Sequence, residues 1–579
     1  MELLKNISVY LFICLSLPSS VLFAQSQPPK GYFRSPVGYP ITLSGSFGEI
    51  RQNHFHSGID IRTGGAIGKP IYAVADGYVS RINVSPYGFG KTIYIRHPNG
   101  YISVYAHLNS FSGSIAKWTK EKQYTMESFA LDTEVPAGML KVAKGDLIAY
   151  SGNSGSSGGP HLHFEIRDGD TQEPMDPFTF GIPIADKTRP KIYNIRIIPH
   201  GFNSMVNFAD NAILLPVAAA GSGFSLKQTD TVRVSGNVVF GIEAFDYHDG
   251  STMKNGVRRY ELFVDDEKRF GMTIDRFRFA DTRYVNSIID YPLYVRTKHR
   301  VVRSYIAPND KLEIFDELSS NGVVNFTDSR AHKVRYVVRD VHGNSSSVTF
   351  WVKSHPPANV RGRLDPALSA KGTWMLCSEA NTYRADGVTL SLPDNALYED
   401  LDFIGSVSGS LPDGFSNVYI LHNKETPLHT YCDLSIRTDR LPAALKGKAL
   451  VARIDAPGKY TSIGGTWEEG QMKCRIRDFG SYTVLVDTTA PVIRPVNIVP
   501  GKNISKQSTI SMKISDNLSG IKTYRGTLNG QWILMDYDAK RDLLTYKYDD
   551  RIRPGKNTFR LVVTDNTGNS SEYSATLTR

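Results

Sequence analysis

Cysteine is scarce in this sequence: there are four among 579 residues, and Cys377, Cys432 and Cys474 lie together in one late region. So few cysteines exclude a small scaffold held together by disulfides. Their spacings also match no zinc-binding cysteine motif. Outside the cytoplasm two of the three can pair and leave one over, and three buried, reduced thiols are the alternative.

Long apolar runs are missing beyond the N-terminal segment. No stretch after residue 24 approaches the roughly 18 uninterrupted apolar residues of a membrane-spanning helix. Residues 1–24 are typical of a secretory signal peptide, with Lys5 as the positive region, 7–17 as the apolar core and 22–24 as the cleavage site. We therefore expect an exported protein of the periplasm, the cell envelope or the medium, which does not span a membrane after cleavage.

Neither sign of charge dominates: Lys and Arg number 67 and Asp and Glu 57, for a formal net charge of +10. The basic residues are dispersed, and an export signal removes the chain from most nucleic acid, so we expect no nucleic-acid partner. The modest positive charge favours anionic surfaces such as cell-wall polymers.

The sequence is rich in residues that favour strands and tight turns, with 30 Tyr, 27 Phe and 49 Gly. Its length suggests about four units. Between residues 30 and 185, several segments alternate apolar and polar residues and are separated by Gly, Asn and Pro, which predicts an antiparallel β domain. Residues 115–130 instead have the spacing of an amphipathic helix, so we expect a small helical insertion at 111–140.

Two later segments, 334–346 and 559–571, resemble each other, because each places an Asp-x-x-Gly-Asn turn between two strands. They predict related β-sandwich modules at 190–355 and 490–579, the second immunoglobulin-like, with a β-rich module at 357–487 between them. The predicted fold class is all-β: an antiparallel β domain with a helical insertion, followed by about three β-sandwich modules. The turn Asp and Asn residues can bind calcium, although turn geometry alone also explains them.

Five residues of the first domain have the types and order of a metal site: His56, Asp60, His107, His161 and His163. Alternate side chains of a strand share a face, so His161 and His163 point the same way. A catalytic zinc ion typically takes three His, Asp or Glu ligands and keeps one position open. One Zn²⁺ held by His56, Asp60 and His163 leaves two imidazoles for chemistry.

These motifs resemble those of the lysostaphin-type or LytM-type zinc endopeptidases, which cut peptide bonds in peptidoglycan. The similarity covers about 47–176 and includes His56-x-Gly-x-Asp60, Tyr-Ala-His107-Leu and Gly-Pro-His161-Leu-His163. The resemblance implies that His56, Asp60 and His163 bind zinc and that His107 and His161 are the catalytic, non-ligand histidines. We assign proton transfer to His161 and oxyanion stabilisation to His107, with the exchanged roles as the alternative.

Three neighbours of these motifs receive other interpretations. His54 is an alternative ligand, but only His56 has the family spacing to Asp60. His97 precedes a Pro-Asn-Gly turn and is expected to be structural. Glu165 shares the face of His163, and we expect it to support the site and not to act as a general base.

The resulting hypothesis is a zinc metalloendopeptidase that acts on peptidoglycan stem peptides or cross-links, with other cell-envelope proteins as further partners of the C-terminal modules. A non-enzymatic cell-wall binding protein or regulator of other hydrolases is the main alternative, and an adhesin or surface scaffold is a third. The glycine-rich segment 151–160 is expected to keep a groove open for an extended substrate. For the insertion at 111–140 three roles stay open: a lid, a docking surface for a regulator, or a neutral surface feature.

Overall fold

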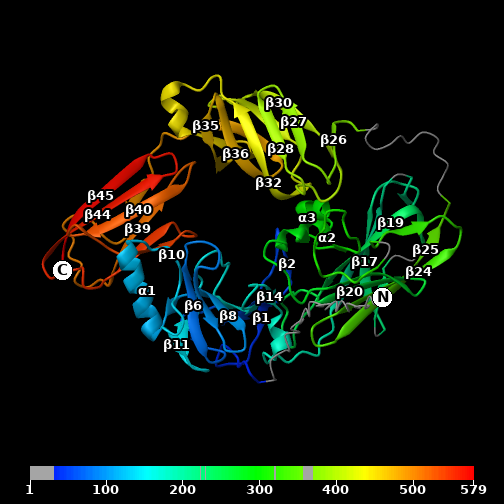
Figure 1. Cartoon of the computed structure of the whole chain (residues 1–579), viewed down its shortest axis with the longest axis horizontal. Coiled ribbons are helices and arrows are strands. Elements are labelled where there is room, and N and C mark those ends of the chain that lie inside the picture. The colour runs from blue at the N-terminus through cyan, green and yellow to red at the C-terminus, as the bar shows by residue number, and fades with distance from the viewer. Residues whose placement is uncertain (1–30, 202, 222, 228–229, 319–320, 357–369) are drawn as a thin grey trace, which may run out of the picture.

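The computed structural model describes residues 31–201, 203–221, 223–227, 230–318, 321–356 and 370–579, so the expected signal peptide at 1–24 lies outside the described residues. Strands dominate, as the predicted all-β class requires. They form four units, which we call the first (31–185), second (186–356), third (370–487) and fourth (488–579). The units follow one another around a closed ring, and the fourth unit returns to the first (Figure 1).

The first unit is built on one antiparallel sheet with the strand order β1-β4-β13-β8-β7-β6-β10, to which β14 adds beside β13 and β11 beside β6. A small sheet, β5-β12-β9, and the hairpin β2-β3 complete the unit. The strands are β1 Leu43–Gly45, β2 Ile50–Arg51, β3 His54–Phe55, β4 Ile59–Arg62, β5 Pro70–Tyr72, β6 Gly77–Val84, β7 Lys91–Arg96, β8 Tyr101–Leu108, β9 Ser110–Phe111, β10 Leu131–Glu134, β11 Lys141–Val142, β12 Leu147–Tyr150, β13 His161–Asp168 and β14 Pro174–Met175; a 3-10 helix, η1 Pro177–Phe180, follows.

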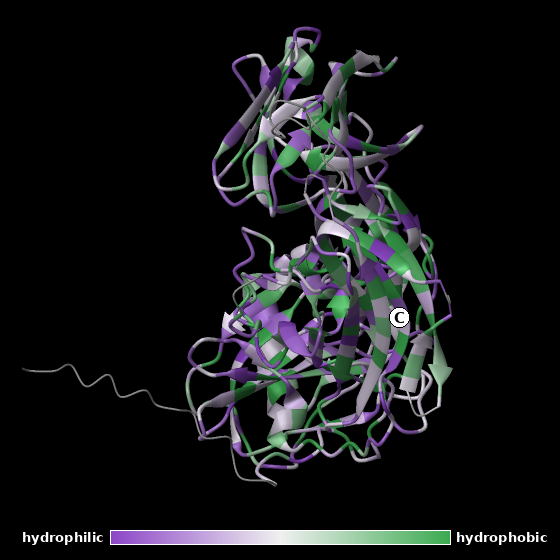
Figure 2. Ribbon diagram, turned by 90° about the vertical axis from the view of Figure 1, so that its right-hand side faces the viewer, coloured by the Kyte–Doolittle hydropathy of each residue, from purple (hydrophilic) through white to green (hydrophobic). Residues whose placement is uncertain are grey.

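Hydrophobic and hydrophilic residues alternate along many strands (Figure 2). In the first unit this alternation separates the two faces of the central strands. Ile59 and Ile61 of β4 and Leu162, Phe164 and Ile166 of β13 are fully buried in one hydrophobic core. The residues between them therefore face the other side of the sheet.

The helix of the insertion is α1, Gly113–Met126, which begins two residues before the predicted segment and ends four residues before its end. The chain leaves the helix at Glu127, whose left-handed conformation (φ 45°) ends the helical hydrogen bonding. The acidic residues that follow form β10, which pairs with β6 at the edge of the sheet. Prediction of a helix as far as residue 130 was therefore wrong, because the helix ends at Met126 and residues 127–130 connect it to β10.

The second unit has the sheet order β16-β19-β15-β17-β18-β25-β24-β20-β21, and the sheet closes on itself because β19 also pairs with β25; β22 and β23 add to β19. Its elements are β15 Lys191–Pro199, β16 Met205–Val206, β17 Ile213–Ala220, β18 Gly223–Leu226, β19 Val232–Phe245, β20 Arg259–Val264, β21 Glu267–Thr273, η2 Thr282–Tyr284, α2 Val285–Ile288, α3 Tyr291–Thr297, β22 Val302–Arg303, β23 Val324–Phe326, β24 Ala331–Arg339 and β25 Ser345–Ser354.

The third and fourth units each contain two main sheets: β27-β28-β32-β36-β35 and β30-β31-β37-β33-β34 in the third, with β26 paired to β29, and β38-β39-β43-β42 and β41-β40-β44-β45 in the fourth. The strands are β26 Thr373–Met375, β27 Asn381–Ala385, β28 Val388–Leu392, β29 Leu401–Phe403, β30 Gly405–Ser410, β31 Asn417–Leu421, β32 Pro427–Arg437, β33 Ala449–Ala456, β34 Lys459–Gly464, β35 Thr466–Glu468, β36 Gln471–Asp478, β37 Gly480–Val486, β38 Val492–Pro495, β39 Thr509–Ser515, β40 Ile521–Leu528, β41 Gln531–Trp532, β42 Met535–Asp538, β43 Leu543–Lys547, β44 Lys556–Asp565 and β45 Ser570–Thr578, with η3 Ala443–Lys448 before β33.

The predicted repeat is visible as two closing hairpins, β24–β25 and β44–β45, each with the Asp-x-x-Gly-Asn turn between its antiparallel strands. All three cysteines of the described residues are unpaired thiols. Among the described helices, none combines the length and the apolar character needed to cross a bilayer.

The ring closes where α1 meets the fourth unit. The ring of Tyr124 packs edge-on against Trp532, with centroids 5.2 Å apart, and its hydroxyl donates to Asp549. Lys120 forms an ion pair with Asp549 at 3.2 Å. The buried apolar residues of the first and fourth units belong to one continuous cluster, so this interface is a packed one.

Candidate metal centre and catalytic site

The expected metal ligands lie on two paired strands and the bend before them. Asp60 of β4 is directly opposite His163 of β13 in the antiparallel register. His56 lies in the bend between β3 and β4, where Gly58 passes so close to β13 that a Cβ would lie 2.3 Å from the carbonyl oxygen of Phe164. Glycine in the His-x-Gly-x-Asp motif therefore permits close backbone approach, and this approach brings His56 to the ion site.

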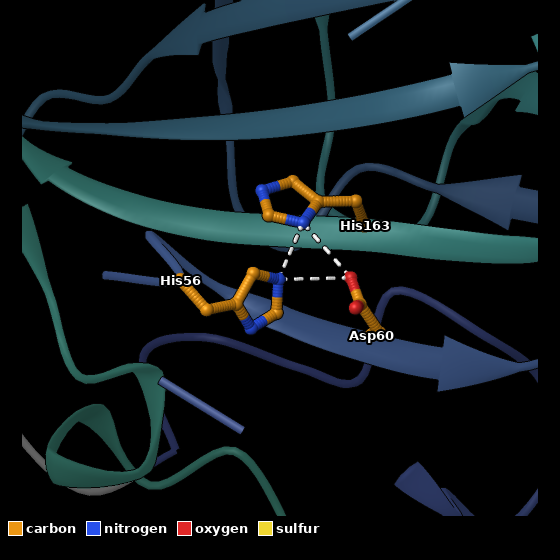
Figure 3. A group of neighbouring side chains, drawn as sticks. All are labelled: His56, Asp60 and His163. Atoms are coloured by element: carbon orange, nitrogen blue, oxygen red, sulfur yellow. Dashed lines mark hydrogen bonds and ion pairs between the residues drawn. The ribbon is translucent and has the colours of Figure 1, made fainter. Parts of the chain in front are cut away.

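Three donor atoms converge at one point (Figure 3): Nε2 of His56, Oδ1 of Asp60 and Nδ1 of His163. His56 Nε2 lies 3.0 Å from both other atoms, and His163 Nδ1 lies 2.9 Å from Asp60 Oδ1. All three residues are buried, with exposed fractions of 5 % or less. The sequence prediction named this same trio.

The hydrogen bonds on the far sides of the two rings turn Nε2 of His56 and Nδ1 of His163 toward each other and toward Asp60. His56 donates Nδ1–H to the carbonyl of Ser46 at 2.7 Å, and His163 donates Nε2–H to Oε1 of Glu165 at 2.9 Å. Two imidazole nitrogens and a carboxylate oxygen thus face one point, where a cation can contact all three. Because such hydrogen bonds are typical of metal-binding histidines, the residues present fit a divalent metal ion.

The charges around His163 also favour a cation at this point. Burial disfavours a charged ring, but Asp60 and Glu165 together raise the pKa of His163 to about 9. Burial likewise opposes ionisation of Glu165, yet Arg167 and His163 lower its pKa to about 2. Arg167 donates Nε–H to Glu165 at 2.5 Å, so a buried chain of alternating charge runs from Arg167 to the metal position, with Glu165 in the supporting role expected from the sequence.

Arg51 and Phe89 are two site residues that the sequence analysis missed. Arg51 on β2 pairs with Oδ2 of Asp60 at 2.6 Å, which leaves Oδ1 for a metal ion. Phe89 stacks on the ring of His163, with centroids 5.1 Å apart. The position of Arg51 in the sequence does not predict its contact with Asp60, because this contact depends on how the β2–β3 hairpin folds back onto β4.

The two other expected histidines line the same site. His161 Nε2 lies 3.3 Å from Asp60 Oδ1, and the rings of His107 and His161 have centroids 4.8 Å apart. Each ring donates Nδ1–H to a loop carbonyl, His107 to Ser154 at 2.9 Å and His161 to Gly159 at 2.8 Å. Burial, together with the nearby rings of His163 and His161, lowers the pKa of His107 to about 3. His107 therefore offers an unprotonated Nε2.

His54 and His97 lie outside this group. His54 is exposed and donates Nδ1–H to the carbonyl of Gln52, in the same turn. His97 is buried, where Nδ1 bonds the carbonyl of Asp76 and Nε2 bonds the hydroxyl of Ser103. Its contacts are those of the structural residue that the sequence predicted.

The glycine-rich loop 151–160 has two different parts. At Gly152 and Gly155 an added Cβ would lie 2.3 Å from backbone atoms of Asn109 and Gly88, so these glycines allow tight packing. At Gly158 and Gly159 nothing lies within 4 Å of an added Cβ. The expected open groove therefore applies only to the second part of the loop, next to His161.

The fourth unit touches this same loop. Lys540 donates to the carbonyls of Asn153 and Ser157, the latter at 3.0 Å. Lys91 pairs with Asp536 beside it. Residues about 380 positions apart in the sequence thus meet at the loop that holds His107 and His161.

Residues 54–124 and 130–177 match the model of Peptidase family M23. The chain contains an M23 peptidase domain. All five expected site residues fall inside the matched ranges, and the interruption at 125–129 coincides with the end of α1. Residues 372–487 match the Zu5-like domain, within the third unit.

Relatives of known name match this part of the chain. It is 33% identical over 143 residues to an uncharacterized metalloprotease of Haemophilus influenzae, covering 24% of this chain and 25% of that protein. It is 30% identical over 143 residues to the peptidoglycan DD-endopeptidase ShyA of Vibrio cholerae, covering 24% of this chain and 27% of that protein. The chain thus spans about a quarter of the length of these relatives.

Among solved structures, the catalytic domain of the prophage-encoded M23 protein EnpA from Enterococcus faecalis is 25% identical, with a TM-score of 0.20. The alignment covers 26% of this chain and 99% of that domain.

Proposed function

We propose that this protein is a zinc-dependent endopeptidase that hydrolyses peptide bonds in the stem peptides or cross-links of peptidoglycan. The observation that carries the proposal is the convergence of one donor atom each from His56, Asp60 and His163 beside two histidines whose Nδ1 atoms are held by loop carbonyls. The M23 domain and a relative named as a peptidoglycan DD-endopeptidase support the substrate class. Since peptidoglycan lies outside the cytoplasm, we also propose that the protein is exported.

Zinc is the metal that this donor set suits best. Two imidazole nitrogens and one carboxylate oxygen are a typical three-ligand set of catalytic zinc sites, which leave a position open. A zinc ion bound there supplies Lewis acidity toward a carbonyl group and toward water. Arg51 occupies the second oxygen of Asp60, so this carboxylate offers one atom to the ion.

His161 is suited to accept the proton of the attacking water. Its Nδ1 is held by the carbonyl of Gly159, and its Nε2 lies on the side of Asp60 and the metal position. The same ring returns that proton to the leaving amine.

His107 has the same tautomer, because its Nδ1–H is fixed on the carbonyl of Ser154. It stabilises an oxyanion only after Nε2 gains a proton, and its lowered pKa opposes this step in the free enzyme. The assignment of oxyanion stabilisation to His107 thus requires that the reacting groups supply the proton.

A direct test uses the full chain, loaded with zinc or treated with a chelator, and purified peptidoglycan. We expect new amino groups, detected by mass spectrometry, only with the loaded protein. His107→Ala and His161→Ala should each slow release by roughly 10²-fold or more, with unchanged zinc content, because general acid–base catalysis contributes about that much. His54→Ala is the matched control and should behave as the parent.

The same experiment distinguishes an enzyme from a non-enzymatic binder. A binder has no use for two imidazoles beside the metal ligands, so its peptidoglycan retention would not depend on His107 or His161. If zinc-loaded protein releases no amino groups and His163→Ala behaves identically, the enzyme hypothesis fails.

A further inference from the structure

The second and fourth units each gather three aspartates at the end where the chain enters the unit. In both units one comes from the entering segment, one from an internal loop and one from the Asp-x-x-Gly-Asn turn. The second unit uses Asp186, Asp246 and Asp340, and the fourth uses Asp516, Asp565 and Asp487, the residue directly before it. These two clusters therefore occupy equivalent places in related modules.

Only the cluster of the second unit contains histidines. His248 follows Asp246 by two residues, and His342 follows Asp340 by two residues. At the same offsets the fourth unit has Leu518, two residues after Asp516, and Thr567, two residues after Asp565. The fourth unit thus serves as a natural comparison for what these imidazoles add.

Carboxylate and imidazole atoms of the second unit lie within reach of one ion. One ligand atom each from Asp186, Asp246 and His248 lie within 4.8 Å of one another, and Asp186, Asp340 and His342 form a second such group. Nδ1 of His248 is 3.2 Å and Nδ1 of His342 is 3.8 Å from Oδ2 of Asp186. Asp186 belongs to both groups and connects them.

Several of these atoms are buried without a hydrogen bond. Within the described residues, both ring nitrogens of His248, Oδ1 of Asp246 and Oδ2 of Asp186 have no hydrogen-bond partner. His248 is 5 % and Asp246 3 % exposed. No lysine or arginine of the described chain forms an ion pair with these carboxylates or with Asp340. Buried polar atoms in this state cost free energy unless a ligand satisfies them.

Both units bond two of their aspartates alike, since Asp186 accepts the backbone N–H of Thr188 and Asp340 accepts the backbone and side-chain N–H of Asn344. The fourth unit also bonds the second oxygen of its entering aspartate. Asp487 accepts backbone N–H groups of Thr489 and Ser519, and Asp565 accepts both the backbone and the side-chain N–H of Asn569. Only Oδ1 of the half-buried Asp516 lacks a partner among the described residues. Fewer polar atoms of this cluster therefore lack a partner than in the cluster of the second unit, among the described residues.

We propose that Asp186, Asp246 and His248, flanked by Asp340 and His342, bind a divalent first-row transition-metal ion, with Zn²⁺ as the test ion. Mixed carboxylate and imidazole donors suit such ions better than calcium, which prefers oxygen ligands alone. This site is separate from the catalytic centre and does not depend on the proposed function.

The position of the site indicates what the ion does. Asp186 belongs to the segment that joins the first and second units, and Phe178 of η1 packs against the rings of His248 and His342, with centroids 5.9 and 5.8 Å away. An ion here ties the joining segment to two loops of the second unit. It therefore fixes the orientation of the peptidase domain against the rest of the ring.

Metal stoichiometry of the full chain tests the proposal. Metal-free protein is titrated with Zn²⁺ by calorimetry, and the bound zinc is counted by elemental analysis after dialysis. We expect two ions for the parent, one for His163→Ala, and one for His248→Leu/His342→Thr, which copies the residues of the fourth unit. Combining all three substitutions should abolish tight zinc binding.

Thermal unfolding supplies a second readout that does not rely on activity. Zinc should raise the melting temperature of His163→Ala, since a ligand that binds only the folded state stabilises it. That rise should vanish when His248→Leu/His342→Thr is added, while Asp516→Asn in the fourth unit should leave it unchanged. If His163→Ala binds no zinc, or if the two histidine substitutions leave its stoichiometry and melting shift intact, the proposal is refuted.

Discussion

Replacing Glu165 by Gln separates two roles of one buried carboxylate. Glu165 is fully buried and accepts hydrogen bonds from Nε2–H of His163, from the hydroxyl of Ser57 and from Nε–H of Arg167. Glu165→Gln removes the negative charge with little change in size. It leaves Arg167 buried without its counter-charge and weakens the bond that orients His163.

Two losses of different size follow. Breaking a buried ion pair by neutralising one partner costs about 3–5 kcal/mol of folding free energy. Loss of the carboxylate behind a metal-binding histidine lowers metal affinity by roughly 10–100-fold, which corresponds to about 1.4–2.7 kcal/mol. The loss of folding free energy arises from the unpaired charge of Arg167, and the loss of metal affinity arises from the weaker orientation of His163.

A second substitution separates the loss of folding free energy from the loss of metal affinity. Arg167→Met keeps an unbranched, polarisable side chain where the guanidinium now stacks on Phe279, 4.5 Å from its ring centroid. The double variant Glu165→Gln/Arg167→Met should recover most of the lost stability, measured by denaturant unfolding of the metal-free protein. Its zinc affinity, measured by competition with a chromophoric chelator, should stay as low as that of Glu165→Gln.

The outcome that contradicts this reasoning is equally specific. If the double variant recovers the zinc affinity of the parent, Glu165 does not act on the metal site through His163. If Glu165→Gln alone leaves the unfolding free energy unchanged, the pair with Arg167 is not the buried pair described. Glu572→Gln, which neutralises an exposed partner of Arg560 in the fourth unit, is the control and should leave zinc affinity unchanged.

Two further predictions concern the loop and the structural histidine. Lys540→Met removes the contacts to the carbonyls of Asn153 and Ser157, so we expect a several-fold lower kcat with unchanged zinc content; an unchanged kcat would show that the loop holds His107 and His161 without the fourth unit. Burial lowers the pKa of His97 to about 4, so the unfolded chain binds this proton first as the pH falls. The neutral His97 contributes about 3 kcal/mol at most to the free energy of unfolding. This contribution is complete above about pH 6.5 and is lost as the pH falls to about 4. Denaturant unfolding at several pH values should therefore show a weaker pH dependence for His97→Gln, and a dependence identical to that of the parent would refute the assignment.

The ligand set was predictable because its geometry is local or follows strand periodicity. Alternation along one strand was enough to place His161 and His163 on one face, and the register of β13 with β4 then places His163 opposite Asp60. The motif glycine suggested a flexible bend, whereas the structure shows that Gly58 is needed for close contact with β13. Motif spacing thus identified the site, and pairing of strands completed it.

Contacts between distant segments were not predictable in this way. Arg51 contacts the second carboxylate oxygen of Asp60, and Lys540 contacts loop 151–160. Both contacts form only when a hairpin or a whole unit folds back onto the site. No periodicity within a segment encodes such contacts. The end of α1 was also missed, because the spacing of apolar residues does not mark the left-handed residue Glu127 at which the helix ends.

The insertion at 111–140 now has a partner within the chain. Tyr124 and Lys120 of α1 hold Asp549 of the fourth unit, and Glu127 pairs with Arg525 at 2.5 Å. Because the fourth unit also reaches loop 151–160, the helix and the catalytic loop contact the same unit. A lid, a docking surface for a regulator and a neutral surface feature were the roles considered for the insertion, and none of them included this contact with the chain's own last module. A change in how that module sits on α1 would therefore be transmitted to the loop carbonyls that orient His107 and His161.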